Sequence, residues 1–170
     1  MPSGPVDSHG APTADDAFRA HAPRVLAYLQ GQRVAEPEDL LGDVFVQVAR
    51  SIGSFQGDEH LLRRWIFTIA RNCVVDDRRR RSRRPELADA PVPDRPVDEV
   101  GVTDPDLVRA LAGLTPDQRE VIGLRFVADL PLEDVAEITG RPVGAVKSMQ
   151  HRALAALART LEADDGAGER

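Results

Sequence analysis

Residues 132–161 read LEDVAEITGRPVGAVKSMQHRALAALARTL and hold the clearest structural signal in the chain. Apolar side chains recur every three or four positions over 132–139 and again over 142–161, which is typical of two amphipathic helices. Gly140 stands between the two runs, and its backbone can adopt the tight turn that would join them. The segment therefore predicts a helix-turn-helix, in which the second helix enters the DNA major groove through its N-terminal residues.

Hydrogen-bonding side chains gather on the polar side of the second predicted helix, close to its start. They are Lys147, Ser148, His151 and Arg152. Side chains of these types contact both base edges and phosphates in protein–DNA complexes. A plain helical hairpin with a polar outer face would show the same pattern, so this segment alone leaves both interpretations open.

The first half of the chain also predicts helices. Apolar spacings of three and four begin near Asp15, begin again at Glu36-Pro37 and run once more over 60–80. Pro23 is expected to kink or restart the first of these helices, because proline removes a helical hydrogen bond. The loop between the last two helices is expected over 51–58, where two glycines fall.

The second half predicts two further helices, over 107–114 and 116–126. The residues TPDQ at 115–118 form a capping box at the start of the second one, since a threonine and a glutamine three positions apart satisfy each other's backbone N–H groups. Turn-linked alternating runs typical of strands are missing, and the chain has only five Phe, one Trp and one Tyr. The fold class is therefore predicted to be all-α.

The composition divides the chain into five segments. They are a disordered tail over 1–13, a helical domain over 14–84, an acidic linker over 85–106, a second helical domain over 107–161 and a tail over 162–170. The linker combines five prolines with seven acidic residues and one arginine, and it shows no amphipathic period. Such composition favours an extended, flexible tether. We expect two small helical domains joined by this linker.

Charge is unevenly distributed along the chain. The whole protein has a net charge of −6 and a pI of about 5.2. Residues 71–84, by contrast, carry seven arginines and two aspartates, a local net charge of +5. Basic residues at a helix end can simply complement the helix dipole. This run holds more arginines than a dipole requires, which favours contact with phosphate, although an acidic protein is not expected to coat nucleic acid unaided.

Several classes of protein are excluded by the same sequence. No run approaches the ~20 apolar residues of a membrane-spanning helix, and the first residues do not resemble a secretory signal. The four histidines and one cysteine lack metal-ligand spacing, and His60 and Cys73 are interpreted as a surface and a core residue. No glycine-rich phosphate loop or nucleophile elbow occurs. We expect a cytoplasmic protein that is not an enzyme and needs no cofactor or metal.

Two sets of motifs resemble the extracytoplasmic-function (ECF) sigma factors of the sigma-70 family. The first half carries EDL at 38–40, DVF at 43–45, SFQGD at 54–58 and WIFTIARN at 65–72. The second half carries LTPDQREV at 114–121, LRF at 124–126, EDVA at 133–136, VGAVKS at 143–148 and HRA at 151–153. The resemblance covers 18–84 and 107–161, and it implies a promoter-melting domain followed by a helix-turn-helix domain.

This resemblance implies an alternative sigma factor that binds core RNA polymerase of bacteria and directs promoter recognition and transcription initiation. Its expected partners are core RNA polymerase, promoter DNA and an anti-sigma factor able to hold it at the membrane; no small-molecule substrate is expected. The acidic linker would pass through the basic RNA exit path of the polymerase. A stand-alone helix-turn-helix transcription regulator and a helical protein adaptor are the alternatives.

The resemblance also implies roles for individual residues. Asp39, Asp43 and Gln47 would contact the polymerase, with Val44 and Phe45 in the core. The −10 element would be bound by Phe55, Arg71, Asn72, Arg78 and Arg79, and the −35 element by Lys147, Ser148, His151 and Arg152. Trp65 is expected to pack in the core, and Arg125 and Arg141 are further candidates for DNA-backbone contact. Pro131 stands where the family often has a serine cap, and Gln150 where a basic residue is common, so promoter preference does not transfer.

Overall fold

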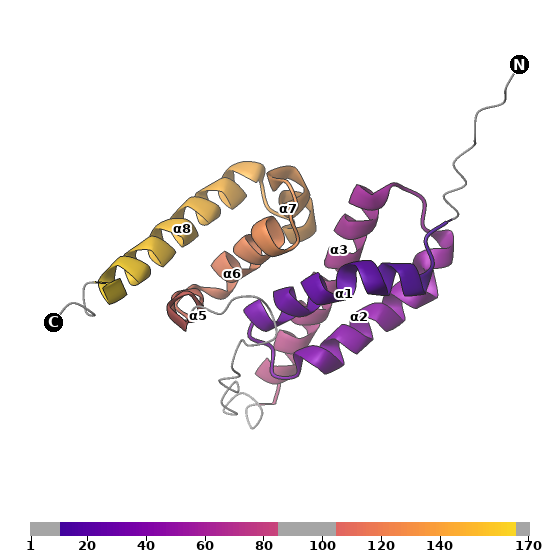
Figure 1. Ribbon diagram of the computed structural model, residues 1–170, viewed down its shortest axis with the longest axis horizontal. Helices are drawn as coiled ribbons and strands as arrows, with labels where there is room; N and C mark the ends of the chain where they lie inside the picture. Colours follow the sequence, from indigo (N-terminus) through magenta and orange to yellow (C-terminus); the bar gives the residue numbers. More distant parts are fainter. Residues whose placement is uncertain (1–10, 85–104, 166–170) are drawn as a thin grey trace, which may run out of the picture.

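The computed structural model describes residues 11–84 and 105–165, and every regular element in these two ranges is a helix (Figure 1). The fold is all-α, as predicted. None of these helices is long and apolar enough to cross a lipid bilayer. Of the predicted linker and tails, residues 1–10, 85–104 and 166–170 lie outside the described residues.

The first helical unit consists of α1 (Ala14–Gly31), α2 (Pro37–Ser51), the short 3₁₀ helix η1 (Ile52–Ser54) and α3 (Glu59–Ser82). Side-chain caps define two of the starts. Thr13 and Asp16 form a capping box at α1, and the Asp58 carboxylate accepts a hydrogen bond of 2.9 Å from the Leu61 N–H at α3. These caps satisfy backbone N–H groups that have no partner within a helix.

Pro23 does not restart the first helix, which was one of the two outcomes expected there. α1 continues through Pro23 as one element, and its apolar neighbours Ala22 and Val25 are both buried. The energetic cost of one missing hydrogen bond is outweighed by burial of the apolar face, since tertiary packing supplies most helix stability in proteins.

The second unit consists of α5 (Pro105–Ala112), α6 (Pro116–Ile122), a π-helical turn η2 (Gly123–Val127), α7 (Leu132–Thr139) and α8 (Val143–Asp165). Thr115 and Gln118 form the predicted capping box. Gly140 ends α7 with a left-handed backbone, φ +67°, as the helix-turn-helix prediction requires.

Several boundaries differ from those expected, and the loop predicted over 51–58 contains the 3₁₀ helix η1. α5 begins at Pro105, inside the predicted linker, and α8 continues past Leu161 to Asp165. The helix predicted over 116–126 changes from α to π geometry at Gly123, where it passes close to α1. Pro131 opens α7 without a side-chain cap, as its lack of a polar side chain predicts.

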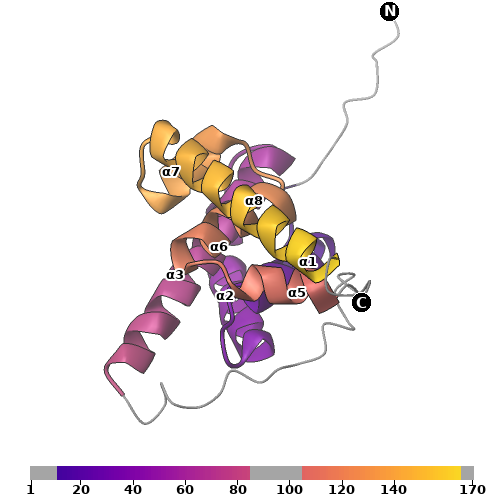
Figure 2. The same ribbon diagram turned by 90° about the vertical axis from the view of Figure 1, so that its left-hand side faces the viewer.

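The two units do not merely follow each other along the chain; they share one core. Tyr28, Leu29 and Phe67 of the first unit belong to the same buried cluster as Val121, Leu124 and Leu130 of the second. α1 packs on η2, and the N-terminal part of α3 lies beside α7, as Figure 1 and Figure 2 show. A smaller cluster, which includes Ala110, Leu114 and Leu157, joins α5, α6 and α8.

Candidate nucleic-acid and polymerase interface

The N-terminal half of α8 presents a polar face to solvent. Lys147, Ser148, His151 and Arg152 are all exposed, and they follow one side of the helix at intervals of one, three and one residue. Val146 and Met149 point the other way and are buried. The fold therefore brings the four residues of the predicted −35 site together on one accessible surface, where a major groove could receive them.

Side-chain contacts of Arg125, Arg141 and Gln150 attach α8 to the neighbouring segments of the second unit. Arg141 lies 2.9 Å from Asp117 Oδ1 and donates to the Met149 sulfur, and its hydrogen bond to Asp117 raises the pKa of the guanidinium. Arg125 donates to Gln150 Oε1 at 2.9 Å and to the Leu130 carbonyl. Both arginines thus make contacts within the second unit.

The candidate −10 residues on α3 lie in different environments. Asn72 and Arg79 are exposed. Arg71 is half-buried and its Nε lies 2.9 Å from Glu120 Oε1, and Arg78 donates to Gln32 Oε1 at 3.0 Å. In this arrangement two of the four α3 candidates face solvent, and the other two are engaged by protein groups.

Phe55, the fifth candidate of the −10 site, stacks on Trp65. The ring centroids lie 5.4 Å apart with 28° between the planes, and both side chains are half-buried against the main core. Gly57 makes this loop possible: its φ is +156°, and a Cβ there would lie 3.0 Å from Phe55 Cζ and from Leu61. Trp65 was expected in the core, and its stacking partner was not predicted from the sequence.

The predicted polymerase contacts form a line along α2. Asp39, Asp43 and Gln47 are exposed at intervals of four residues, with Val44 and Phe45 buried behind them as expected. Gln47 Nε2 lies 3.3 Å from the sulfur of Cys73, whose burial raises the pKa of its thiol. This face borders a surface hollow between α2 and α3 that also includes Arg79.

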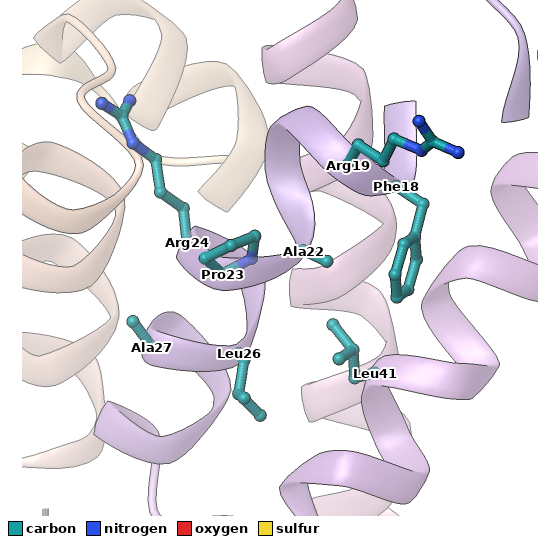
Figure 3. Close-up of a pocket in the computed structure, with 8 residues that line it drawn as sticks. All are labelled: Phe18, Arg19, Ala22, Pro23, Arg24, Leu26, Ala27 and Leu41. Atoms are coloured by element: carbon teal, nitrogen blue, oxygen red, sulfur yellow. The ribbon is translucent and has the colours of Figure 1, made fainter. Parts of the chain in front are cut away.

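A second hollow lies between α1 and α2, where Phe18 and Leu41 point toward each other beside Ala22 and Leu26 (Figure 3). Its walls are mostly apolar, and Phe18 packs edge-on against Phe45 with centroids 4.9 Å apart. It contains none of the predicted binding residues. Among the described residues, no three histidine, cysteine, aspartate or glutamate side chains are placed to hold a metal ion.

Sequence reasoning missed the residues that join the two units. Glu120 is a carboxylate with only 3% exposure that pairs with Arg71, and His60 pairs with Asp134 at 2.7 Å. These partners are far apart in the chain, so no local spacing could reveal them. His60, expected at the surface, is only partly exposed because of this contact.

Known proteins resemble both units. The family model described as Sigma-70 region 2 matches residues 17–84, and that described as Sigma-70, region 4 matches residues 110–159. ECF RNA polymerase sigma factor BldN of Streptomyces coelicolor is 34% identical over 149 residues, which are 83% of this chain and 56% of that protein. ECF RNA polymerase sigma factor RpoE of Cereibacter sphaeroides is 33% identical over 147 residues, which are 82% and 81% of the two chains.

Solved structures agree with this pattern. The sigma factor RpoE of Bartonella quintana, in complex with the anti-sigma factor NepR, superimposes with a TM-score of 0.72 at 28% identity, covering 88% of this chain and 97% of that one. CnrH, in complex with the cytosolic domain of CnrY, has the same fold, with a TM-score of 0.62 at 24% identity and coverage of 89% and 88%.

Proposed function

Because the chain belongs to the extracytoplasmic-function sigma factors of the sigma-70 family, we propose that it binds core RNA polymerase and directs it to a specific set of promoters. Sigma factors are transcription initiation factors and not enzymes. The observation that carries this function is the presence of both family regions in order on one chain, at 17–84 and 110–159.

The division of labour follows the two units. The domain over 14–84 would bind polymerase and the −10 element, the linker over 85–106 would connect, and the domain over 107–161 would bind the −35 element. The exposure of Asp39, Asp43 and Gln47 on α2 supports a role in polymerase binding. These three side chains contribute little to the core, so they are available to a partner.

The −10 element would be melted and held by the first unit. The stacked pair Phe55 and Trp65 offers an aromatic surface, and Asn72, about two turns beyond Trp65 on α3, is exposed. An unstacked base can regain stacking on such a surface, which offsets an extrusion cost of a few kcal/mol. Arg71, Arg78 and Arg79 would contact the phosphates of the same strand.

The −35 element would be read by α8. Lys147, Ser148, His151 and Arg152 supply donors and acceptors to base edges and phosphates. Their common exposed face supports this assignment.

Control by an anti-sigma factor is also proposed. One structural relative, the sigma factor RpoE of Bartonella quintana, was solved in complex with the anti-sigma factor NepR. The present chain would act in the cytoplasm, and an anti-sigma factor anchored in the membrane would hold it there until a signal releases it.

Run-off transcription with core RNA polymerase and genomic fragments tests the function. Wild-type protein should produce discrete start sites, and an Asn72→Ala, Lys147→Ala double variant should lose them. Arg159→Ala, which removes an exposed cation of α8 about two turns beyond Arg152, serves as the control. Specific operator binding by the chain without polymerase, and no transcripts with it, would instead favour a stand-alone regulator.

A further inference from the structure

Three arginines from separate parts of the chain gather around Gln32. Arg33 follows Gln32 in the segment between α1 and α2, Arg78 lies on α3 and Arg119 lies on α6. Gln32 is only 3% exposed and joins the other two: its Oε1 accepts a hydrogen bond of 3.0 Å from Arg78 Nη2, and its Nε2 donates one of 3.0 Å to the Arg119 carbonyl. Residues as much as 87 positions apart thus form one cationic cluster.

This cluster lacks the carboxylates that usually accompany arginines in a folded protein. In the part of the chain that the structure describes, Arg33, Arg78 and Arg119 form no ion pair with an aspartate or a glutamate. Three acidic side chains close to Arg78 or Arg119 in the sequence are engaged by other arginines: Glu120 by Arg71 at 2.9 Å, Asp77 by Arg81 at 3.1 Å and Asp117 by Arg141 at 2.9 Å. The positive charges of the cluster therefore have no ion-pair partner among the described residues.

Arg119 shows the electrostatic consequence. Its Nη1 donates to the carbonyls of Ala112 at 3.3 Å and Leu114 at 2.8 Å, whereas its Nε is buried without a hydrogen-bond partner among the described residues. Burial, and after it the positive charges of Arg33 and Arg78, lower the pKa of this guanidinium below its usual value. Like charges held this close repel each other, and a bound anion would remove the repulsion.

The backbone at Arg33 gives a second, independent indication. Its φ is +55°, a left-handed conformation that is unfavourable for most residues with a Cβ and that glycine or asparagine adopts more readily. Arg33 is exposed, and its side chain has no hydrogen bond or ion pair within the described ranges that would explain an arginine here. Strain of this kind at an exposed turn points to a function of the side chain.

From this arrangement we propose that Arg33, Arg78 and Arg119 form a binding site for a small anion with one or more phosphate groups, such as pyrophosphate or the phosphate chain of a nucleotide. The planar guanidinium group binds phosphate oxygens in pairs, which a lysine ammonium cannot do. Arg78 and Arg119 are half-buried, so a compact anion reaches them more easily than a DNA backbone does. Binding by the isolated chain does not require the proposed function to be correct.

Isothermal titration calorimetry of the full chain with inorganic pyrophosphate, at a physiological ionic strength of about 0.15 M, tests the site. Wild-type protein should bind at a single saturable site. Arg33→Gln and Arg119→Gln should each weaken binding at least about tenfold, the usual effect of losing a hydrogen bond to a charged group. Arg19→Gln is the matched control and should bind like wild type, because it removes an exposed arginine about three turns before the end of α1.

Arg33→Gly separates a binding role from a structural one. Glycine adopts the left-handed conformation without strain, so this variant should unfold at the same temperature as wild type or a higher one when pyrophosphate is absent. It should nevertheless bind pyrophosphate at least about tenfold more weakly. Pyrophosphate should raise the unfolding temperature of wild type and raise that of the variant much less. Undiminished affinity in Arg33→Gly would overturn the proposal.

A parallel titration with ATP identifies the source of the phosphate. A higher affinity for ATP than for pyrophosphate would assign the site to a nucleotide, and an equal or lower one would assign it to the phosphate groups alone; both agree with the proposal.

Three results would overturn it. One is the absence of saturable binding to wild type at millimolar pyrophosphate. Another is equal weakening in Arg19→Gln, which would reduce the effect to net charge. The third is binding of a single DNA strand, in place of pyrophosphate, that depends on Arg33 and Arg119, since the cluster would then belong to a nucleic-acid interface.

Discussion

Phe55 and Trp65 stack with their centroids 5.4 Å apart, one from the loop before α3 and the other from α3 itself. The contact fixes the loop that carries the SFQGD motif against the helix that carries WIFTIARN. Two motifs of the proposed −10 site are therefore one structural unit, and a change in either ring affects the other's position.

Single substitutions of the two rings should have different effects on stability and on promoter opening. Trp65→Ala should lower the free energy of unfolding by about 2–3 kcal/mol, because it removes more packing area against the core. Phe55→Ala should lower the free energy of unfolding by only about 1 kcal/mol. For each kcal/mol of stability lost, however, it should impair promoter opening more than Trp65→Ala does. Urea denaturation and permanganate reactivity of melted thymines give the two readouts. Equal ratios of stability loss to opening loss in both variants would assign Phe55 a purely structural role.

Substitutions on the exposed face of α8 should change DNA recognition and leave stability intact. Lys147→Ala and Arg152→Ala should weaken transcription from all target promoters, and His151→Ala should alter preference at one position of the −35 element by about 1–3 kcal/mol. Their unfolding free energies should stay within about 0.5 kcal/mol of wild type, as is usual for exposed sites. Transcription from a randomised −35 library, with Arg159→Ala as the reference, makes the measurement.

Truncation of exposed polar side chains on α2 should weaken polymerase binding and leave stability unchanged. Asp43→Ala combined with Gln47→Ala should reduce the affinity for core polymerase, because both side chains are exposed to solvent on the predicted face. The free energy of unfolding should change by about 0.5 kcal/mol or less, as is usual for exposed positions. Fluorescence titration of labelled protein with core enzyme tests this. Wild-type affinity in the double variant would remove both residues from the interface, and Glu36→Gln at the N-cap of α2 is the control.

Loss of the capping box at α6 should destabilise the second unit. The Thr115 hydroxyl accepts a hydrogen bond from the Gln118 N–H at 3.2 Å, and the Gln118 side chain accepts one from the Thr115 N–H at 3.0 Å. Thr115→Ala should cost about 1 kcal/mol, whereas Thr115→Ser should be close to neutral. Chemical denaturation of the two variants compares them directly; a similar loss in both would argue against the cap.

The protein should become less stable as the pH is lowered below neutral, partly because of His21. This side chain is 3% exposed with Nε2 3.1 Å from Glu59 Oε1, and burial lowers its pKa below the usual 6.5 more than Glu59 raises it. The unfolded chain therefore binds the proton more readily, so the free energy of unfolding decreases as pH falls below about 6.5. His21→Gln should make this decrease smaller, as measured by urea titrations at pH values above and below about 6.5. An unchanged dependence of the unfolding free energy on pH in the His21→Gln variant would exclude His21 as its cause.

Local signals were sufficient for most of the secondary structure. The spacing of apolar residues predicted α7 with both ends correct, and TPDQ at 115–118 predicted the cap of α6. The left-handed backbone of Gly140 follows from the same short segment. Interactions within one helical turn decide these features, so a single sequence contains them. The effect of Pro23 depends on what the helix packs against, so the sequence alone left a kink and a restart both open.

The amino-acid sequence predicts the all-α class, the order of the two sigma regions and the exposed polar face of α8, since each depends on residues close together in the chain. The contact of Arg71 with Glu120, the approach of Tyr28 to Gly123 and the shared core of the two units are visible only in the folded protein. These contacts join positions separated by dozens of residues. Their formation depends on the shape and charge of whole helix faces, which no local pattern records.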